Sequence, residues 1–238
     1  MNALNAWQIS AAPSSAGYFD ESLRQHMLRV YNYMGLGLVV TGVVAYVVAS
    51  TPAIYQPIFG TPLKWVVMFA PLAFVFCLSF RIQTISATTA QTLFWAFCAL
   101  MGLSLAAVFF VFTGTSIART FFITAAMFGA TSLYGYTTQR DLSKFGSFLF
   151  MGLIGVVIGS LVNLLIGSSA LQFVISIVGV LVFTGLTAYD TQNIKEHFAE
   201  ESGTESNSKL AVWGALSLYL NFINIFQLLL NLTGDREE

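Results

Sequence analysis

Asp190 is the only acidic residue that lies within one of the long apolar stretches of this sequence. An ionised carboxylate near the centre of a bilayer costs about 2.5–3.5 kcal/mol on insertion scales, and acids in such places mark ion pathways or proton relays. Because Lys195 follows near the same end of the stretch, Asp190 could instead cap a helix end or reach the membrane interface. We predict a functional role for the Asp190 carboxylate.

A stripe of small and polar residues follows in the last apolar stretch. Its members recur at steps of three and four: Gly214, Ser217, Asn221, Asn224, Gln227 and Asn231. Such steps place side chains on one face of a helix. Buried amides without partners are costly, so this face must contact protein or water rather than lipid. It provides either hydrogen bonds between helices or a polar path along a central helix, for which Ser217, Asn224 and Gln227 are the pore-lining candidates.

The composition indicates which kind of element positions these residues. Of 238 residues, 56% are hydrophobic and 9% are charged, and the mean hydropathy is +0.76. Soluble domains carry about 25% charged residues. The sequence therefore predicts an all-α integral membrane protein, since apolar segments that face lipid must satisfy their backbone groups internally. Seven apolar runs have the length to cross a bilayer: about 30–49, 62–80, 90–112, 119–138, 145–166, 171–191 and 210–232.

Lysine and arginine predict the orientation of these runs. Seven lie on the side of the N-terminus: Arg24, Arg29, Arg81, Arg140, Lys144, Lys195 and Lys209. Three lie on the opposite side: Lys64, Arg119 and Arg236. We therefore expect a cytoplasmic N-terminus and an external C-terminus. The expected domains are a flexible cytoplasmic segment (1–22), a seven-helix transmembrane domain (23–232) and a C-terminal tail (233–238).

Several classes of protein are disfavoured by the same residues. The net charge of −1 provides no basic surface for nucleic acid. The predicted spans contain no histidine for an intramembrane zinc site and no second acid for aspartyl chemistry. We therefore expect that the protein is not an enzyme. Cys77 and Cys98 lie in apolar runs and are read as small core residues. Gly152, Gly155 and Gly159 are expected to allow close helix packing.

Three stretches resemble the Bax inhibitor motif family of membrane proteins, and in particular its bacterial branch. They are SLYGYTTQRDLS (132–143), GLTAYDTQ (185–192) and LSLYLNFIN (216–224), and the resemblance extends over about residues 22–232. It implies seven helices, with the last one central and surrounded by the other six. It also implies a pH-sensitive calcium leak across a membrane, which for this branch is the bacterial inner membrane.

The resemblance further implies a gate made of two facing aspartates, latched by an arginine from the second helix. Asp190 corresponds to the first aspartate, and Arg81 is the candidate latch, although Arg81 could equally be an interface anchor. The second aspartate is replaced by Asn221. Two close carboxylates can share a proton and titrate near neutral pH, whereas an amide cannot titrate. We therefore expect a blunted pH response.

Calcium is the ion that this set of residues would accept. Hard cations prefer oxygen ligands, and a single carboxylate with amide and hydroxyl oxygens makes a weak, transient site at Asp190. No other cofactor is expected, and calcium is present only as the permeant ion. The expected partners are the lipid bilayer and calcium. The alternative function is an interaction protein that regulates a membrane protease or other membrane proteins, as part of the family is thought to do.

Overall fold

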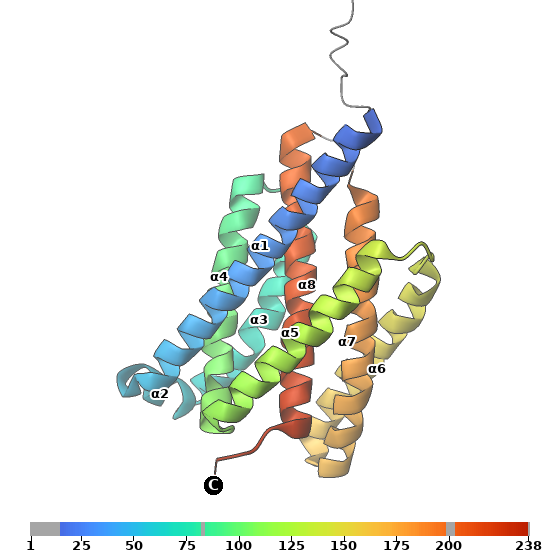
Figure 1. Cartoon of the computed structure of the whole chain (residues 1–238). Coiled ribbons are helices and arrows are strands. Elements are labelled where there is room, and N and C mark those ends of the chain that lie inside the picture. The colour runs from blue at the N-terminus through green and yellow to red at the C-terminus, as the bar shows by residue number, and fades with distance from the viewer. Residues whose placement is uncertain (1–14, 82–83, 199–202, 238) are drawn as a thin grey trace, which may run out of the picture.

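A computed structural model describes residues 15–81, 84–198 and 203–237, with side chains for residues 21–76, 84–198 and 205–237. The described residues form helices joined by short connections (Figure 1). In chain order they are α1 (Ser15–Ser50), α2 (Pro52–Phe59), α3 (Leu63–Arg81), α4 (Ala87–Leu105), the 3₁₀ helix η1 (Ala106–Phe110), α5 (Gly114–Thr137), α6 (Ser143–Ile166), α7 (Ser169–His197) and α8 (Gly203–Thr233).

Six of the described helices are long and apolar enough to span a membrane, and the bent pair of α2 with α3 raises the number to seven. The prediction of an all-helical membrane protein is thereby confirmed. α2 and α3 meet at an angle of 89°. The sequence did not predict α2, which begins at Pro52 and contains Pro57. Proline suits the first turn of a helix but disrupts its interior, which is consistent with a short helix that ends in a sharp bend.

α8 lies in the middle of the bundle, as predicted from its polar stripe. In the most apolar part of each helix, 61% of α8 is buried, compared with 6% of α6. The main neighbours of α8 are α1, α4, α5 and α7, whereas α3 packs on α4 and α6 packs on α7. The central helix is therefore held by four principal neighbours, and α3 and α6 lie mainly on the outside. The side chain of Tyr219 on α8 is fully buried, and its hydroxyl lies 2.6 Å from Thr41 Oγ1 of α1.

The two ends of the bundle differ in charge. α1, α6 and α8 begin at the upper end in Figure 1, and α5 and α7 end there. This is the end that carries most of the lysines and arginines, which agrees with the predicted topology. The predicted N-terminal segment 1–22 is described only from Ser15, where α1 begins, and residues 1–14 lie outside the described part. The cytoplasmic location of this end stays a prediction.

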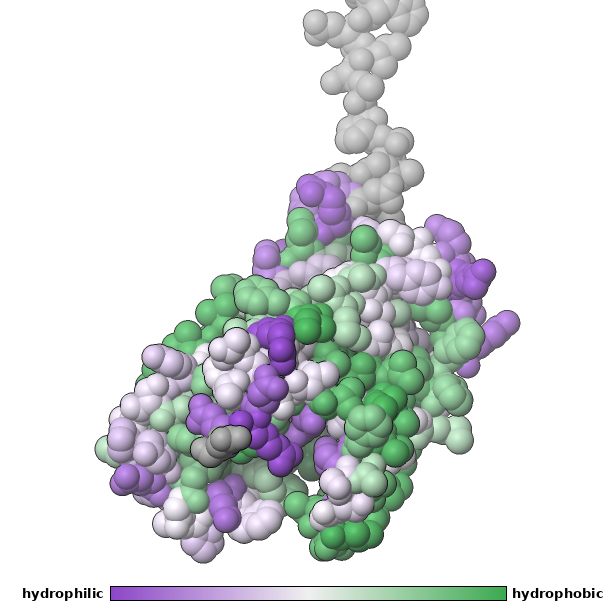
Figure 2. All heavy atoms as spheres, turned by 60° about the horizontal axis from the view of Figure 1, so that its bottom comes forward, coloured by the Kyte–Doolittle hydropathy of each residue, from purple (hydrophilic) through white to green (hydrophobic). Residues whose placement is uncertain are grey.

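The C-terminal tail closes the opposite end. Thr113 N–H donates to Asp235 O (3.0 Å), and the Asp235 carboxylate accepts hydrogen bonds from Ser116 Oγ (3.1 Å) and from Arg119 (3.3 Å). These contacts fasten the tail to the start of α5. Figure 2 shows this end from below, where hydrophilic side chains cross the middle of the face and hydrophobic ones border them.

Glycines set the distance between several helices. A Cβ at Gly152 would lie 2.8 Å from Val182 of α7, and one at Gly159 would lie 3.4 Å from Ile175. The prediction was wrong for Gly155, where a Cβ would meet nothing within 4 Å. Because a helix turns 100° per residue, Gly155 lies at the edge of the stripe and is exposed.

Candidate functional site

Asp190 faces the central helix. Its Oδ2 atom accepts hydrogen bonds from Ser217 Oγ (2.5 Å) and from Asn221 Nδ2 (2.8 Å). Asn221 is buried, with 5% of its surface exposed, and Asp190 and Ser217 are partly buried. Asp190 is in no ion pair with a described side chain. The structure therefore brings the predicted intramembrane acid together with the polar stripe of α8, and both donors come from that stripe.

The positions of these three side chains follow from helix geometry. Ser217 and Asn221 are one turn apart on α8, so that their side chains lie one above the other. Asp190 lies two turns before His197, where α7 ends. It therefore lies within the candidate membrane span Ser169–His197, near the end that carries most of the basic residues.

The other predicted site residues form no hydrogen bond with Asp190 among the described side chains. Asn224 donates to the backbone oxygen of Leu220 in its own helix (2.7 Å), and Gln227 is partly buried. The structure therefore does not join them to Asp190. Arg81 is the last residue of α3, but its side chain is not among those described. Its predicted role as a latch stays a prediction.

A second polar cluster next to the site was not predicted. The hydroxyl of Tyr31 on α1 lies 2.7 Å from Ser132 Oγ on α5, which lies 2.9 Å from Thr191 Oγ1 on α7. Thr191 follows Asp190 in the sequence but faces α5 rather than α8. This chain of hydroxyls connects three helices, with Ser132 and Thr191 buried.

One signal for this cluster was present in the sequence. Small hydroxyl residues recur on the buried face of α5 at multiples of four: Ser116, Thr120, Thr124 and Ser132. Thr124 donates to Thr120 O (2.8 Å) within the helix. The stripe predicts a face that contacts protein. Tyr31 and Thr191 have no such pattern around them and are found only in the structure.

Gln192 joins two of the stretches that carry the family resemblance. Its Oε1 accepts from the backbone N–H of Leu142 (2.8 Å), and its Nε2 donates to the backbone oxygen of Arg140 (2.9 Å). The side chain thereby fixes the α5–α6 connection against α7. In the same connection, Ser143 N–H donates to Asp141 (2.8 Å), which holds the pKa of that exposed carboxyl below its usual range.

Replacing Gln192 by leucine is expected to lower the free energy of unfolding by about 1–3 kcal/mol, because both backbone partners lose their hydrogen bonds. Thermal unfolding in detergent would measure the change. Gln139→Leu is the matched control, since Gln139 is an exposed residue of the same region. Equal stability of the two variants would contradict this role of Gln192.

The groups around Asp190 determine how a cation could bind there. Among the described residues, no group of three or more histidine, cysteine, aspartate or glutamate side chains could hold a metal ion. At Asp190 the hydroxyl proton of Ser217 and the amide nitrogen of Asn221 point at the carboxylate. A cation at Asp190 would have to turn these groups so that their oxygens face it. With one carboxylate and no second acidic ligand, the described residues at Asp190 do not form a closed metal centre.

Comparison with known proteins places the chain in a family. Residues 23–238 match the family model described as "Inhibitor of apoptosis-promoting Bax1". The chain is 48% identical to an uncharacterized protein of Rickettsia prowazekii, over 92% of this chain and 93% of that protein. It is 47% identical to the inner membrane protein YbhL of Escherichia coli, over 90% of this chain and 93% of YbhL. The chain therefore belongs to the Bax inhibitor-1 family of membrane proteins.

Proposed function

We propose that this protein is a passive leak for calcium through the bundle around α8, with Asp190 as its controlling residue. The observation that carries the proposal is the Asp190 carboxylate, which lies inside a membrane span and is held by Ser217 and Asn221 of the central helix. An intramembrane acid that forms no ion pair with a described side chain favours the approach of a cation. In this proposal the protein has no enzymatic activity, and it binds calcium only while the ion crosses the membrane.

The proposed response to pH is blunted. In the arrangement implied by the family resemblance, two aspartates share a proton. Here Asn221 occupies the second position and donates to Asp190 over 2.8 Å. Because an amide does not titrate, the pair cannot pass through a state with two ionised carboxylates. Ser217 is proposed to line the path beside Asp190, and Asn224 and Gln227 to line it farther along α8.

We also propose the bacterial inner membrane as the location, with the N-terminus in the cytoplasm. The relative YbhL is called an inner membrane protein. The end of the bundle at which α1 begins has seven of the ten lysines and arginines. Positive residues prefer the cytoplasmic side of a membrane, which supports this orientation.

The direct test is calcium entry into liposomes that contain a calcium-sensitive dye and the purified protein alone. We expect faster entry than into protein-free liposomes of the same lipid. The alternative, a regulator that docks on a membrane protease or another membrane protein, predicts no increase, because a docking protein has no reason to conduct ions by itself. Entry at the protein-free rate would therefore reject the leak and favour the regulator.

A further inference from the structure

A groove lies between α1 and α5. It is on the side of the bundle where α1 and α5 each pass in front of α8 (Figure 1). Its volume is about 560 Å³, which is within the range of about 300–1,000 Å³ found for small-molecule pockets. Most of its lining is apolar, and it includes Met27 and Leu28 from α1 and Phe128 and Leu133 from α5. Leu28 is 47% exposed and Leu133 is 63% exposed, so the groove opens to the side, toward the lipid.

The end of the groove nearest the start of α1 is polar and basic. Arg24 of α1 and Tyr136 of α5 line it. Lys195 of α7 donates to the backbone oxygen of Tyr136 (3.0 Å), and its ammonium lies 5.4 Å from the centre of the Tyr136 ring. Arg24 thus lines the groove itself, and Lys195 lies behind the lining residue Tyr136 as a second cation from another helix.

Both cations, Arg24 and Lys195, are able to bind an anion. Arg24 donates from Nε and Nη2 to the Glu21 carboxylate (2.9 Å each), but both side chains are exposed to solvent, so an anion can compete with Glu21 for Arg24. Lys195 forms no ion pair with a described side chain. An ammonium has three donors, and the Tyr136 oxygen takes one of them. The site therefore combines an apolar slot with a positively charged end.

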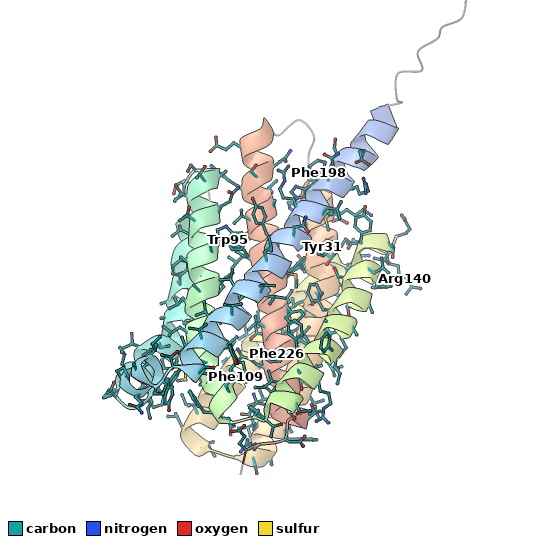
Figure 3. All side chains as sticks on the ribbon, turned by 60° about the vertical axis from the view of Figure 1, so that its left-hand side comes forward. Tyr31, Trp95, Phe109, Arg140, Phe198 and Phe226 are labelled. Carbon is teal, nitrogen blue, oxygen red and sulfur yellow. The ribbon has the colours of Figure 1, made fainter. Side chains whose placement is uncertain are left out.

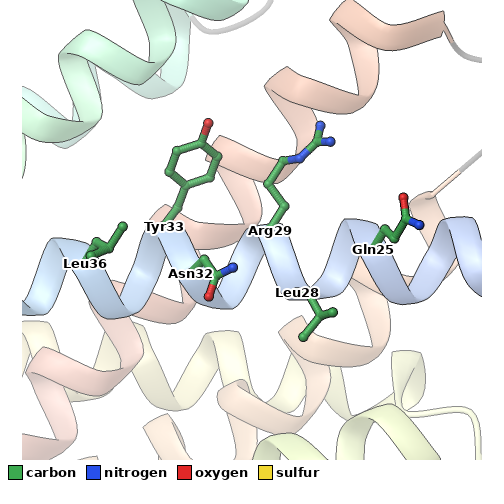
Figure 4. Close-up of a pocket in the computed structure, with 6 residues that line it drawn as sticks. All are labelled: Gln25, Leu28, Arg29, Asn32, Tyr33 and Leu36. Atoms are coloured by element: carbon green, nitrogen blue, oxygen red, sulfur yellow. The ribbon is translucent and has the colours of Figure 1, made fainter.

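A neighbouring hollow lies beside the groove on α1. It is lined by residues of α1 alone, and Figure 4 shows Arg29 and Tyr33 pointing to the side opposite Leu28. Leu28 lines both hollows. Because a single helix provides its whole lining, this second hollow carries no site of its own, and Arg29 is not part of the groove.

We propose that the α1–α5 groove binds one anionic phospholipid, with an acyl chain in the groove and its phosphate between Arg24 and Lys195. The lateral opening admits an occupant from the bilayer, the apolar lining fits a hydrocarbon chain, and the charge selects an anionic headgroup. The floor of the groove includes Tyr31 and Ser132, whose hydroxyls continue to Thr191 on α7. Figure 3 labels Tyr31 on α1, in the upper half of the bundle. The proposal does not depend on the calcium leak.

The test uses native mass spectrometry of the full-length protein in detergent, with phosphatidylglycerol and phosphatidylcholine of identical acyl chains. We expect phosphatidylglycerol to be retained in preference, by roughly fivefold for each contributing cation. The double change Arg24→Gln with Lys195→Gln should remove the preference. Arg140→Gln, which changes an exposed cation outside the groove, should retain it.

Filling the groove provides an independent test. A Cβ at Gly129 meets nothing within 4 Å, and Gly129 lines the groove, so Gly129→Leu places a side chain there without a clash of its Cβ. Gly155→Leu makes the same change at an exposed, open position of α6. We expect loss of the retained phosphatidylglycerol in the first variant and wild-type retention in the second.

The proposal would be overturned by equal retention of the two lipids by the wild type, by an unchanged preference in the double glutamine variant, or by equal retention of phosphatidylglycerol by Gly129→Leu and Gly155→Leu. Displacement of phosphatidylglycerol by excess inorganic phosphate would assign the site to a free anion and reject the lipid. If Gly129→Leu does not fold, the surface changes at Arg24 and Lys195 still decide the outcome.

Discussion

Replacing Asn221 by aspartate is expected to make the calcium flux rise by about tenfold or more between about pH 6 and pH 8. Asn221 Nδ2 lies 2.8 Å from Asp190 Oδ2, so the new carboxylate would lie directly against the old one. At low pH the two groups can share a proton and hold α7 against α8. When that proton is lost, two negative charges repel each other and the helices separate.

The control is Asn231→Asp. Asn231 lies on the same helix but is exposed, and its amide donates to the backbone oxygen of Gln227 (2.9 Å) rather than to Asp190. A carboxylate there has no paired carboxylate at hydrogen-bond distance, and we expect a pH dependence close to that of the wild type. Dye-loaded liposomes would report both variants. A flat pH profile for Asn221→Asp would contradict the role of Asn221 as the position of the missing titratable group.

Replacing Gly135 by alanine is expected to lower the free energy of unfolding by about 1–3 kcal/mol, as overpacking commonly does. A Cβ at Gly135 would clash with the backbone oxygen of Ala188, so α5 and α7 would have to move apart. A flexible side chain could give way, but the backbone of a packed helix cannot do so locally. The change also acts near the functional site, because Ser132 and Thr191 are bonded across the same pair of helices.

Gly129→Ala makes the same substitution on the same helix, at a position where a Cβ meets nothing within 4 Å. Alanine is the better helix former by about 1 kcal/mol, so we expect this control to be slightly stabilised. Denaturation of both variants in mixed detergent micelles would measure the difference. If the free energy of unfolding changed in the same direction in both variants, the close approach of α5 to α7 at Gly135 would not matter for stability.

The sequence predicted the elements whose signal lies within a single helix. Apolar length is such a signal, and it identified the membrane spans. The three- and four-residue steps of Ser217, Asn221 and Asn224 also lie within one helix, and they correctly indicated that α8 faces protein. Asp190 was singled out because a carboxylate in an apolar run is conspicuous by itself.

Features that depend on how two helices meet could not be predicted in this way. Periodicity defines a face of a helix but not the neighbour that covers it. Thr191 therefore gave no sign that it bonds to Ser132, and Gly155 was expected to pack although it lies at the edge of its stripe. The short helix α2 was missed because its eight residues lie between two apolar runs and contain two prolines.

The most direct measurement compares calcium entry at neutral pH into liposomes that contain the wild type, Asp190→Asn or Asp141→Asn. Asp141 is an exposed carboxyl of the α5–α6 connection, and its lowered pKa keeps it ionised at neutral pH, so its change removes one negative charge outside the membrane. We predict that entry falls by about tenfold or more in Asp190→Asn and stays near the wild-type rate in Asp141→Asn. If Asp190→Asn conducted calcium as fast as the wild type, Asp190 would not control the leak.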